Sequence, residues 1–287
     1  MEYVLEVNNL TKEYKDFKLD DISLKIPKGS VVGLIGENGA GKSTFINSIL
    51  NINEPEKGEV KIFNKNINEH EKDIKEDIAV IFDKSHYSEY MNAKLIGKML
   101  SKIYKNWDNE KYYSLLENFD LPVNKKIKKF SKGMKMKLEF ALALSHNPKF
   151  LILDESTSGL DPVFRDEILE LLRSYTENEE NSILISSHIT SDLDKISDYL
   201  AFIHEGRLQF IKEYEDIHDN YGVLSCKKDF FDSLSPDDIV FYRKEAFSYK
   251  VLVKNRMELM NIYKDLIIEN ASVEDVMLFY IKGEKVQ

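Results

Sequence analysis

The stretch that decides the fold of this chain is Val31-Val32-Gly33-Leu34-Ile35-Gly36-Glu37-Asn38-Gly39-Ala40-Gly41-Lys42-Ser43-Thr44. Its first five residues predict a short buried strand, and a helix is expected to begin near Lys42. Glycines between the two elements allow a tight turn whose backbone N–H groups point inward, and the helix adds the positive end of its dipole. The stretch therefore predicts a P-loop, which holds the phosphates of a nucleoside triphosphate.

The P-loop also predicts a metal site. Lys42 would reach the β and γ phosphates, and the hydroxyl of Ser43 would bind Mg²⁺, which keeps most of its waters. We expect phosphate contacts from Gly36, Asn38, Gly39, Ala40, Gly41, Lys42, Ser43 and Thr44. A single match to this pattern can arise by chance, so the assignment of a P-loop needs support from other motifs in the chain.

The composition is that of a globular protein with one large core. The 287 residues are 43% hydrophobic, which suits a main domain of about 200 residues with a smaller appendage. A balance of 40 basic and 50 acidic residues gives a net charge of −10, which argues against a nucleic-acid partner. The exception is a group of seven lysines between Lys125 and Lys137, which could face phosphate, anionic lipid or only water.

The sequence predicts neither a membrane span nor an export signal. Its apolar stretches fall short of the roughly 20 residues that cross a bilayer, and Met1–Glu6 lacks the regions of a signal peptide. The single cysteine, Cys226, excludes an internal disulfide and fits a reducing compartment. We therefore expect the chain by itself to be cytoplasmic.

Short apolar runs alternate with helical patterns along most of the chain. The runs have strand length and are apolar throughout, as in strands buried on both faces of a parallel sheet. They are Val31–Ile35, Ile78–Phe82, Phe150–Leu153, Ile183–Ile185 and Leu200–Ile203. A helix is expected to begin at Pro162, with Asp161 as its N-cap. The repetition of strand and helix predicts an α/β fold built on a P-loop sheet.

Two additions to this sheet are predicted. Alternating segments at Tyr3–Val7, Leu19–Ile26 and Glu59–Phe63 indicate an antiparallel β layer beside the P-loop. Helical spacing at about residues 84–144 indicates a helical insertion. Its apolar stripes are expected to be core rather than a ligand site, among them Ile96, Met99, Leu100, Ile103, Met136 and Phe140.

The chain changes character after about Lys212, where the motifs stop. Strands are expected at Ile239–Tyr242 and Tyr249–Val253, and helices from about Arg256 and Ser272. We therefore assign residues 1–212 to the nucleotide-binding domain and 213–287 to a small α+β accessory domain.

A second motif completes the first. The apolar strand Phe150–Leu153 ends in Asp154 and Glu155, and in a P-loop sheet this end of the strand faces the nucleotide. Asp154 would then hold Mg²⁺ through water, and Glu155 would polarise the attacking water. Taken alone, the two carboxylates could equally be an acidic turn that caps a strand, and the upstream P-loop makes the metal site the better interpretation.

Further motifs occur in a fixed order around this pair. Phe130-Ser131-Lys132-Gly133-Met134 precedes it, Ser158-Gly159-Leu160-Asp161-Pro162 follows it, and His188 ends the run Ile183–Ser187. These motifs, in this order, resemble the ATP-binding subunit of an ABC transporter over roughly residues 3–210. The resemblance implies ATP and Mg²⁺ as cofactors and ATP hydrolysis as the activity.

The resemblance also implies roles for residues outside the P-loop. Tyr14 matches the aromatic residue that stacks on adenine, although it could be an ordinary turn tyrosine. His188 matches the switch histidine that contacts the γ-phosphate; the alternative is a local hydrogen bond. Ser131 and Gly133 match the signature turn, and Asp161 matches the residue that links two nucleotide sites across a dimer. Lys42, Glu155 and His188 would be the catalytic set.

Two departures from the family pattern stand out. Lys132 and Met134 occupy signature positions that usually hold Gly and Gln. Asp83 occupies the place of a Gln that joins the insertion to the sheet; its carboxylate either faces Mg²⁺ or its water, or has no such role.

The details most resemble the subunits of bacitracin-resistance and YtrB-type exporters. This resemblance implies a subunit at the cytoplasmic face of the membrane that pairs with a second ABC ATP-binding subunit, identical or different, and with membrane-spanning permease subunits. The permease is expected to dock near Phe82–Met91, at Tyr87 and Tyr90, and the substrate to be an antimicrobial peptide or lipid-like molecule. Two alternatives remain: a soluble ABC ATPase that acts on ribosomes or DNA, and a nucleotide sensor that does not hydrolyse.

Overall fold

A computed structural model describes residues 2–83, 87–264 and 266–286 of the chain. Its centre is a six-stranded sheet in the order β10-β9-β3-β8-β7-β6. Neighbouring strands are parallel except at one edge, where β10 runs antiparallel to β9. The strands are β3 (Val31–Ile35), β6 (Ile78–Ile81), β7 (Phe150–Asp154), β8 (Ser182–Ser186), β9 (Tyr199–His204) and β10 (Arg207–Glu213). The α/β sheet predicted from the apolar runs is confirmed.

An antiparallel layer covers one face of this sheet. It has the order β2-β1-β4-β5 and comprises β1 (Tyr3–Tyr14), β2 (Phe17–Pro27), β4 (Lys57–Ile62) and β5 (Lys65–Asn66). Apolar side chains of this layer form one core with α1 (Lys42–Ile49) and with alternate residues of the central strands. α2 (Ile67–Glu76) follows the layer and contributes Ile74 to the same core.

The helices α6 (Pro162–Thr176) and α7 (Thr190–Ile196) cover the opposite face. The α6 helix begins as predicted: Asp161 accepts a hydrogen bond from the backbone N–H of Phe164, and Pro162 is the first helical residue. Apolar side chains of the strands point to both faces of the sheet, so a hydrophobic core lies on each side of it. The loops that could bind a ligand lie at the ends of the strands.

The helical insertion contains α3 (Ala93–Leu100), α4 (Asn109–Asn118), the single turn Ile127–Lys129 and α5 (Lys132–Leu144). The α5 helix joins it to the sheet, since Met136 and Phe140 pack against the sheet while Leu138 and Leu142 pack inside the insertion. Two residues expected in the core, Met99 and Ile103, are exposed. The reason is that α3 ends at Leu100 and buries the face that carries Ile96 and Leu100.

The chain ends in a separate four-stranded sheet with the order β12-β13-β11-β14. Its elements are α8 (Tyr214–Asn220), β11 (Gly222–Cys226), α9 (Lys228–Phe231), the turn Pro236–Asp238, β12 (Ile239–Lys244), β13 (Tyr249–Val253), α10 (Arg256–Ile262), β14 (Ile268–Asn270) and α11 (Val273–Lys282). The two predicted strands and two predicted helices are present, and β11 and β14 were not predicted. The boundary at residue 212 stays a prediction.

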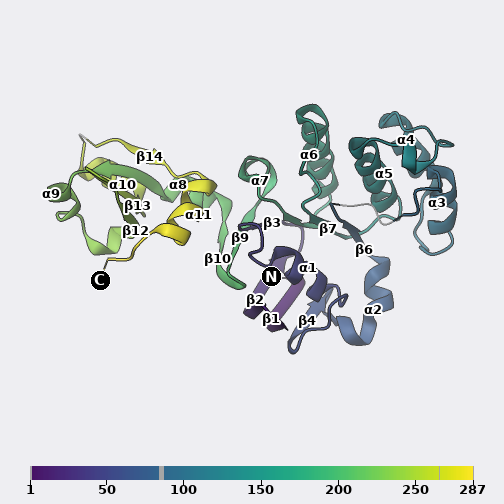
Figure 1. Cartoon of the computed structure of the whole chain (residues 1–287), viewed down its shortest axis with the longest axis horizontal. Coiled ribbons are helices and arrows are strands. Elements are labelled where there is room, and N and C mark those ends of the chain that lie inside the picture. Colours follow the sequence, from purple (N-terminus) through teal and green to yellow (C-terminus); the bar gives the residue numbers. More distant parts are fainter. Residues whose placement is uncertain (1, 84–86, 265, 287) are drawn as a thin grey trace.

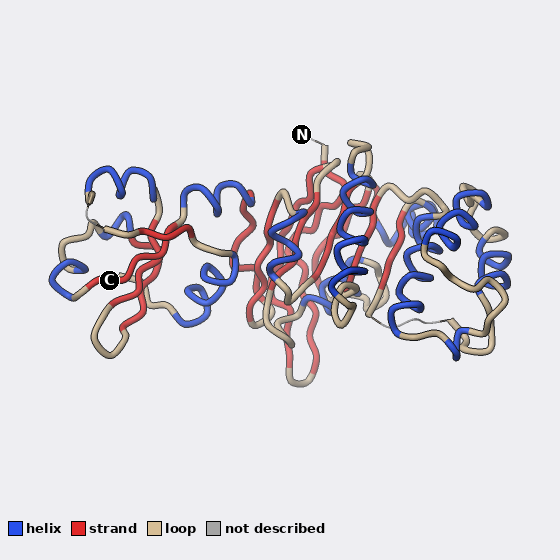
Figure 2. Tube along the Cα trace, turned by 90° about the horizontal axis from the view of Figure 1, so that it is seen from above, coloured by secondary structure: helices blue, strands red, loops and turns tan. Residues whose placement is uncertain are grey.

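Figures 1 and 2 show the insertion and the C-terminal sheet at opposite ends of an elongated molecule, with the central sheet between them. The last helix, α11, returns to the central sheet, where the ring of Tyr280 lies 4.8 Å from that of Phe210 and 4.7 Å from that of Phe241 between centroids. Within the described residues, the helices are too short or too polar to cross a bilayer.

Candidate active site

A cavity of about 590 Å³ opens at the carboxyl end of β3, where the P-loop was predicted. Its walls come from the β1–β2 hairpin, the start of α1 and the end of β7, and its lining residues are Tyr14, Asp16, Phe17, Gly39, Gly41, Lys42, Ser43, Thr44 and Glu155. Residues that are far apart in the sequence therefore meet at one opening, as expected for ligand sites beyond the carboxyl ends of parallel strands.

The turn between β3 and α1 requires glycine at its last position. Gly41 caps α1 with a φ of 114°, and a Cβ atom there would come within 2.8 Å of the ring of Phe17. Gly36 and Ala40 are buried, whereas Asn38 and Gly39 are exposed at the mouth of the turn. The sequence of small residues therefore leaves the backbone of the turn open to a ligand.

Lys42 is the buried cation of the site. Its side chain is 4% exposed, and its ammonium donates hydrogen bonds to the carbonyl oxygens of Gly36 at 2.8 Å and Glu37 at 3.2 Å. The same Nζ lies 3.5 Å from Oε1 of Glu155. A buried ammonium is stable only with such oxygen partners, and phosphate oxygens can replace them.

The two carboxylates after β7 have different surroundings. Asp154 is buried, and its Oδ1 accepts a hydrogen bond of 2.6 Å from the hydroxyl of Ser186, the residue opposite it on β8. Glu155 is partly exposed and has a positive φ of 51°, which is uncommon for a residue with a side chain. Its backbone N–H is held by the carbonyl of Ser186 at 3.2 Å. From this position the side chain reaches Lys42, with Oε1 3.5 Å from Nζ.

His188 completes this group from the next strand. It follows β8, it is 40% exposed, and its Nδ1 lies 3.6 Å from Oε2 of Glu155. The carboxylate of Glu155 therefore has the ammonium of Lys42 on one oxygen and the ring of His188 on the other. The structure thus brings together the three residues that sequence analysis had proposed as catalytic.

The signature turn lies elsewhere on the molecule. Ser131 is the N-cap of α5 and accepts a hydrogen bond from the N–H of Met134, and a Cβ at Gly133 would meet only the Ser131 hydroxyl, 4.0 Å away. Asp161 caps α6 and is exposed. None of these three residues lines the cavity. The turn is exposed and uncrowded, so it is accessible to a ligand held by another molecule.

The cavity also contains residues that sequence analysis missed. Phe17 pairs with Tyr14 across the β1–β2 hairpin, and Asp16 lies in the turn between them. The hairpin register could have suggested Phe17, since cross-strand neighbours share a face. Ser186 had no sequence signal, because its role depends on the register between β7 and β8.

Asp83 is exposed and does not line the cavity. It directly precedes residues 84–86, which lie outside the described part of the chain and belong to the expected docking segment. Its role toward Mg²⁺ stays a prediction. In the described ranges, no cluster of three or more His, Cys, Asp or Glu side chains could hold a metal.

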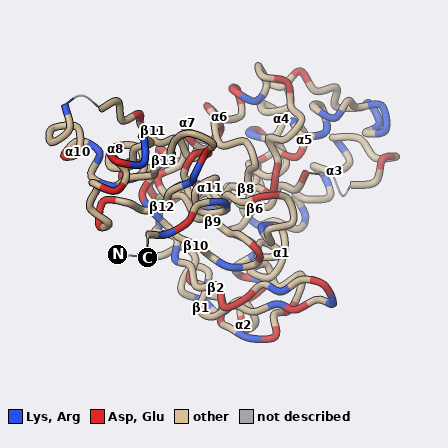
Figure 3. Tube along the Cα trace, turned by 60° about the vertical axis from the view of Figure 1, so that its left-hand side comes forward, with Lys and Arg blue, Asp and Glu red and all other residues tan. Residues whose placement is uncertain are grey.

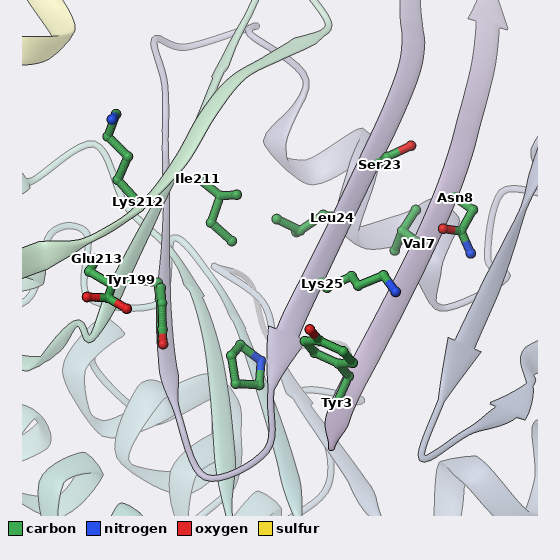
Figure 4. Close-up of a pocket in the computed structure, with 11 residues that line it drawn as sticks. Tyr3, Val7, Asn8, Ser23, Leu24, Lys25, Tyr199, Ile211, Lys212 and Glu213 are labelled. Carbon is green, nitrogen blue, oxygen red and sulfur yellow. The ribbon is translucent and has the colours of Figure 1, made fainter. Parts of the chain in front are cut away.

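A second cavity, of about 540 Å³, lies between β1, β2 and the β9–β10 edge of the central sheet. Figure 4 shows Tyr3, Leu24, Tyr199 and Ile211 around it, with Lys25 alongside. Lys25 is already paired with Glu6 at 2.8 Å. None of the predicted site residues lines this cavity.

Comparison with known proteins agrees with this geometry. Residues 19–158 match the family model described as ABC transporter. The chain is 33% identical over 225 residues to the bacitracin transport ATP-binding protein BcrA of Enterococcus faecalis, covering 76% of this chain and 72% of that protein. The chain belongs to the ABC transporter family. It is an ATP-binding subunit and an ATPase of that family, as the motifs predicted.

Two further proteins extend this identification of an ABC ATP-binding subunit. The lantibiotic transport ATP-binding protein SrtF of Streptococcus pyogenes is 35% identical over 232 residues, covering 74% of this chain and 92% of that protein. A solved ATP-binding subunit of an ABC transporter superposes with a TM-score of 0.69 at 28% identity, covering 75% of this chain and 92% of that one. The predicted resemblance to bacitracin-resistance subunits is confirmed.

Proposed function

We propose that this ABC subunit hydrolyses ATP at Glu155 and that the cycle drives export of an antimicrobial peptide or lipid-like substrate through separate membrane subunits. The observation that carries the proposal is the meeting of Lys42, Glu155 and His188 beside the P-loop cavity. One cation, one carboxylate and one imidazole at a phosphate site are the groups that phosphoryl transfer to water requires.

Each of these three groups has a distinct task. Lys42 exchanges its carbonyl partners for oxygens of the β and γ phosphates and offsets their charge. Glu155 accepts a proton from the attacking water as the new oxygen–phosphorus bond forms and the bond to ADP breaks. His188 donates a hydrogen bond to the γ-phosphate, whose charge is redistributed during the transfer. The 3.5 and 3.6 Å contacts of Glu155 keep these groups within reach of one phosphate.

The residues present also fit Mg²⁺. Ser43 is exposed at the first turn of α1 and lines the cavity. Ser186 occupies only Oδ1 of Asp154, and in the described chain Oδ2 has no hydrogen-bond or ion-pair partner. Ser43 and Asp154 would hold the ion, which would offset the negative charge of the phosphates when bound.

Tyr14 and Phe17 provide the apolar end of the same cavity. Tyr14 is 43% exposed, and Nζ of Lys12 lies 5.5 Å from the centre of its ring. An exposed ring next to a phosphate site can stack on a base, and stacking is tolerant of base identity. We therefore assign adenine to Tyr14.

A second ABC subunit, identical or different, is part of the proposal. Ser131 and Gly133 are outside this subunit's own cavity, so they would contact ATP held by a partner. The Ser131 hydroxyl and the N-terminus of α5 would then donate to the γ-phosphate. Each charge-assisted bond contributes about 1.5–3 kcal/mol. Two filled sites can thus supply the roughly 5.5 kcal/mol that shifts the subunits from mostly separate to mostly joined.

The membrane subunits are proposed to dock on the insertion, at Tyr90 and the lysines that follow α4. Backbone N–H groups of Ile127 and Lys128 donate to the carbonyls of Met91 and Glu89, so the two segments form one surface. The Nζ of Lys128 lies 5.4 Å from the ring centre of Tyr90, which is 73% exposed. Figure 3 shows a run of basic positions in the insertion, near α4 and α5. This surface suits an acidic segment of a permease, and docking there would hold the subunit at the cytoplasmic face of the membrane.

Two relatives support the substrate class. BcrA is named for bacitracin transport and SrtF for lantibiotic transport. By analogy with them, an antimicrobial peptide or similar amphipathic molecule is the substrate we propose for the complex that contains this chain.

The proposal is tested with Glu155→Gln in the full-length protein. The amide cannot accept the proton of water but leaves the P-loop intact, so ATP should bind and hold a dimer that elutes early in size-exclusion chromatography. Phosphate release should fall to background. Glu59→Gln, whose side chain on β4 is 43% exposed and lies away from the cavity, is the matched control and should behave as wild type. A monomer with undiminished phosphate release would contradict the proposal, and a wild-type protein that binds but never cleaves ATP would indicate a sensor.

A further inference from the structure

Lys132, which stands where the family signature usually has glycine, reaches across to the loop that follows the catalytic carboxylate. Its Nζ donates a hydrogen bond of 3.0 Å to the carbonyl oxygen of Ser158. Gly159 makes this contact possible, because it has a φ of 71° and a Cβ there would lie 2.6 Å from the same Nζ. The lysine side chain thus occupies the space that a side chain at position 159 would need.

The bonded loop leads directly back to Glu155. The backbone N–H of Ser158 donates to the carbonyl of Glu155 at 3.1 Å, which closes a turn over residues 155–158. At its other end, the loop is held by Arg165, whose guanidinium donates to the carbonyl of Leu160 at 3.1 Å. Among the described residues, the hydrogen-bond donor to the carbonyl of Ser158 is Lys132.

Lys132 also belongs to the signature turn. It is the first residue of α5 and follows Ser131, the N-cap of that helix. A single charged hydrogen bond therefore connects the turn that is proposed to contact a partner's ATP with the loop that carries this subunit's own Glu155. The connection is local, since it runs through one side chain and one four-residue turn.

We propose that Lys132 is a positioning residue that couples the two ATP sites of the dimer. When the partner's ATP orders the Ser131 turn, the Lys132–Ser158 bond transmits that ordering to Glu155, so one filled site prepares the other. This inference rests on the proposed two-site dimer. Two coupled sites give a Hill coefficient that approaches two, and typical coupling changes affinity by about 5- to 150-fold.

The test is ATP hydrolysis by full-length Lys132→Met, measured as a function of ATP concentration. Methionine keeps the length of the side chain and removes the donor, so the Hill coefficient should fall toward one. Binding of a fluorescent ATP analogue to the isolated monomer should be unchanged, because Lys132 does not line its own subunit's cavity. Lys132→Arg keeps a donor of similar reach and should retain cooperativity.

Two further variants separate this role from a general effect of charge. Lys135→Met removes a lysine three positions further along the same helix, where it pairs with Glu89 at 2.9 Å, and should leave the Hill coefficient as in wild type. Gly159→Ala displaces the ammonium from the other side and should reproduce the loss. The double variant Lys132→Met with Gly159→Ala should have the same Hill coefficient as either single variant, because both changes break the same Lys132–Ser158 hydrogen bond.

The inference would be overturned if Lys132→Met kept full cooperativity, or if it raised the KM for ATP while the Hill coefficient stayed near two. The second result would make Lys132 an ordinary contact to ATP. Failure of the proposed function is distinguishable: Glu155→Gln would then form no ATP-dependent dimer. A dimer of Glu155→Gln with an unaltered Hill coefficient in Lys132→Met overturns the coupling role alone.

Discussion

Nδ1 of His188 lies 3.6 Å from Oε2 of Glu155, so the histidine after β8 and the carboxylate after β7 form a pair across neighbouring strands. The other carboxylate oxygen faces Lys42. The carboxylate thus lies within 4 Å of both nitrogens, 3.5 Å from Nζ of Lys42 and 3.6 Å from Nδ1 of His188. A γ-phosphate that enters would compete for the same two groups, which links phosphate binding to release of the Glu155 carboxylate for water.

His188→Ala should reduce turnover by about 10²- to 10³-fold while ATP affinity changes little, because the imidazole contributes mainly when the γ-phosphate is transferred. Phosphate release and binding of a fluorescent ATP analogue measure the two quantities. His70→Ala is the control, since His70 also lies beside a glutamate, 4.0 Å from Glu69, but is on the surface of α2. Equal turnover in the wild type and His188→Ala would contradict the assigned role.

Lys42→Met should act on binding rather than on turnover alone. The buried ammonium has carbonyl partners at 2.8 and 3.2 Å that phosphate oxygens replace, and a charge-assisted bond is worth about 1.5–3 kcal/mol. ATP affinity should therefore fall by about 10- to 100-fold in equilibrium titration. Lys61→Met, which removes a surface lysine of β4 beside Glu59, should bind ATP as the wild type does. Unaltered affinity in Lys42→Met would exclude the P-loop cavity as the phosphate site.

Tyr14→Ala should weaken ATP and GTP binding together, by about 1–3 kcal/mol, since a stacked ring contacts the face of either base. Tyr14→Phe keeps the ring and should bind as the wild type does. The same titration measures both variants. A loss confined to ATP would mean that Tyr14 reads the edge of the base, and no loss in Tyr14→Ala would leave it an ordinary turn residue.

The sequence predicted those features that depend on local pattern. The strand before the P-loop, the carboxylates after β7 and the cap at Asp161 each follow from a few adjacent residues. Contacts that depend on register or on a long side chain were missed. Ser186 meets Asp154 only because β7 and β8 pair in that register, and Lys132 meets Ser158 across 26 positions of sequence.

Short elements were also missed, for a different physical reason. β14 has three residues, and only Ile268 among them is buried, so periodicity cannot separate it from a loop. Met99 shows the opposite error, because its apolar spacing suggested the core while the short helix α3 leaves it exposed. The sequence left open whether the Lys125–Lys137 group faces phosphate, lipid or only water; in the structure, Lys132 donates to the carbonyl of Ser158 and Nζ of Lys128 lies 5.4 Å from the ring centre of Tyr90.

Tyr280→Ala should loosen the C-terminal part from the central sheet. The Tyr280 ring packs within 4.8 Å of Phe210 and 4.7 Å of Phe241, so removing it from α11 leaves a cavity between the two parts of the chain. We expect a loss of about 3 kcal/mol in the free energy of unfolding, measured by urea denaturation. Tyr280→Phe keeps the ring and is the control. Equal stability of all three proteins would mean that α11 is not anchored by this side chain.

His146 should make the stability of the fold depend on pH. It is 2% exposed, its Nε2–H donates to the carbonyl of Ile78 at 3.1 Å, and its ring stacks on Tyr104 with centroids 3.9 Å apart. Burial lowers the pKa of His146 from its ordinary value of 6.5. Near pH 6.5 the unfolded chain therefore binds a proton at His146 that the folded chain does not bind. This contribution to the free energy of unfolding is complete above pH 6.5 and is lost as the pH falls below that value.

Below pH 6.5, the free energy of unfolding of the wild type should fall by up to about 1.4 kcal/mol per pH unit more than that of His146→Gln, measured by urea unfolding at several pH values. An unchanged slope in His146→Gln would contradict the assignment.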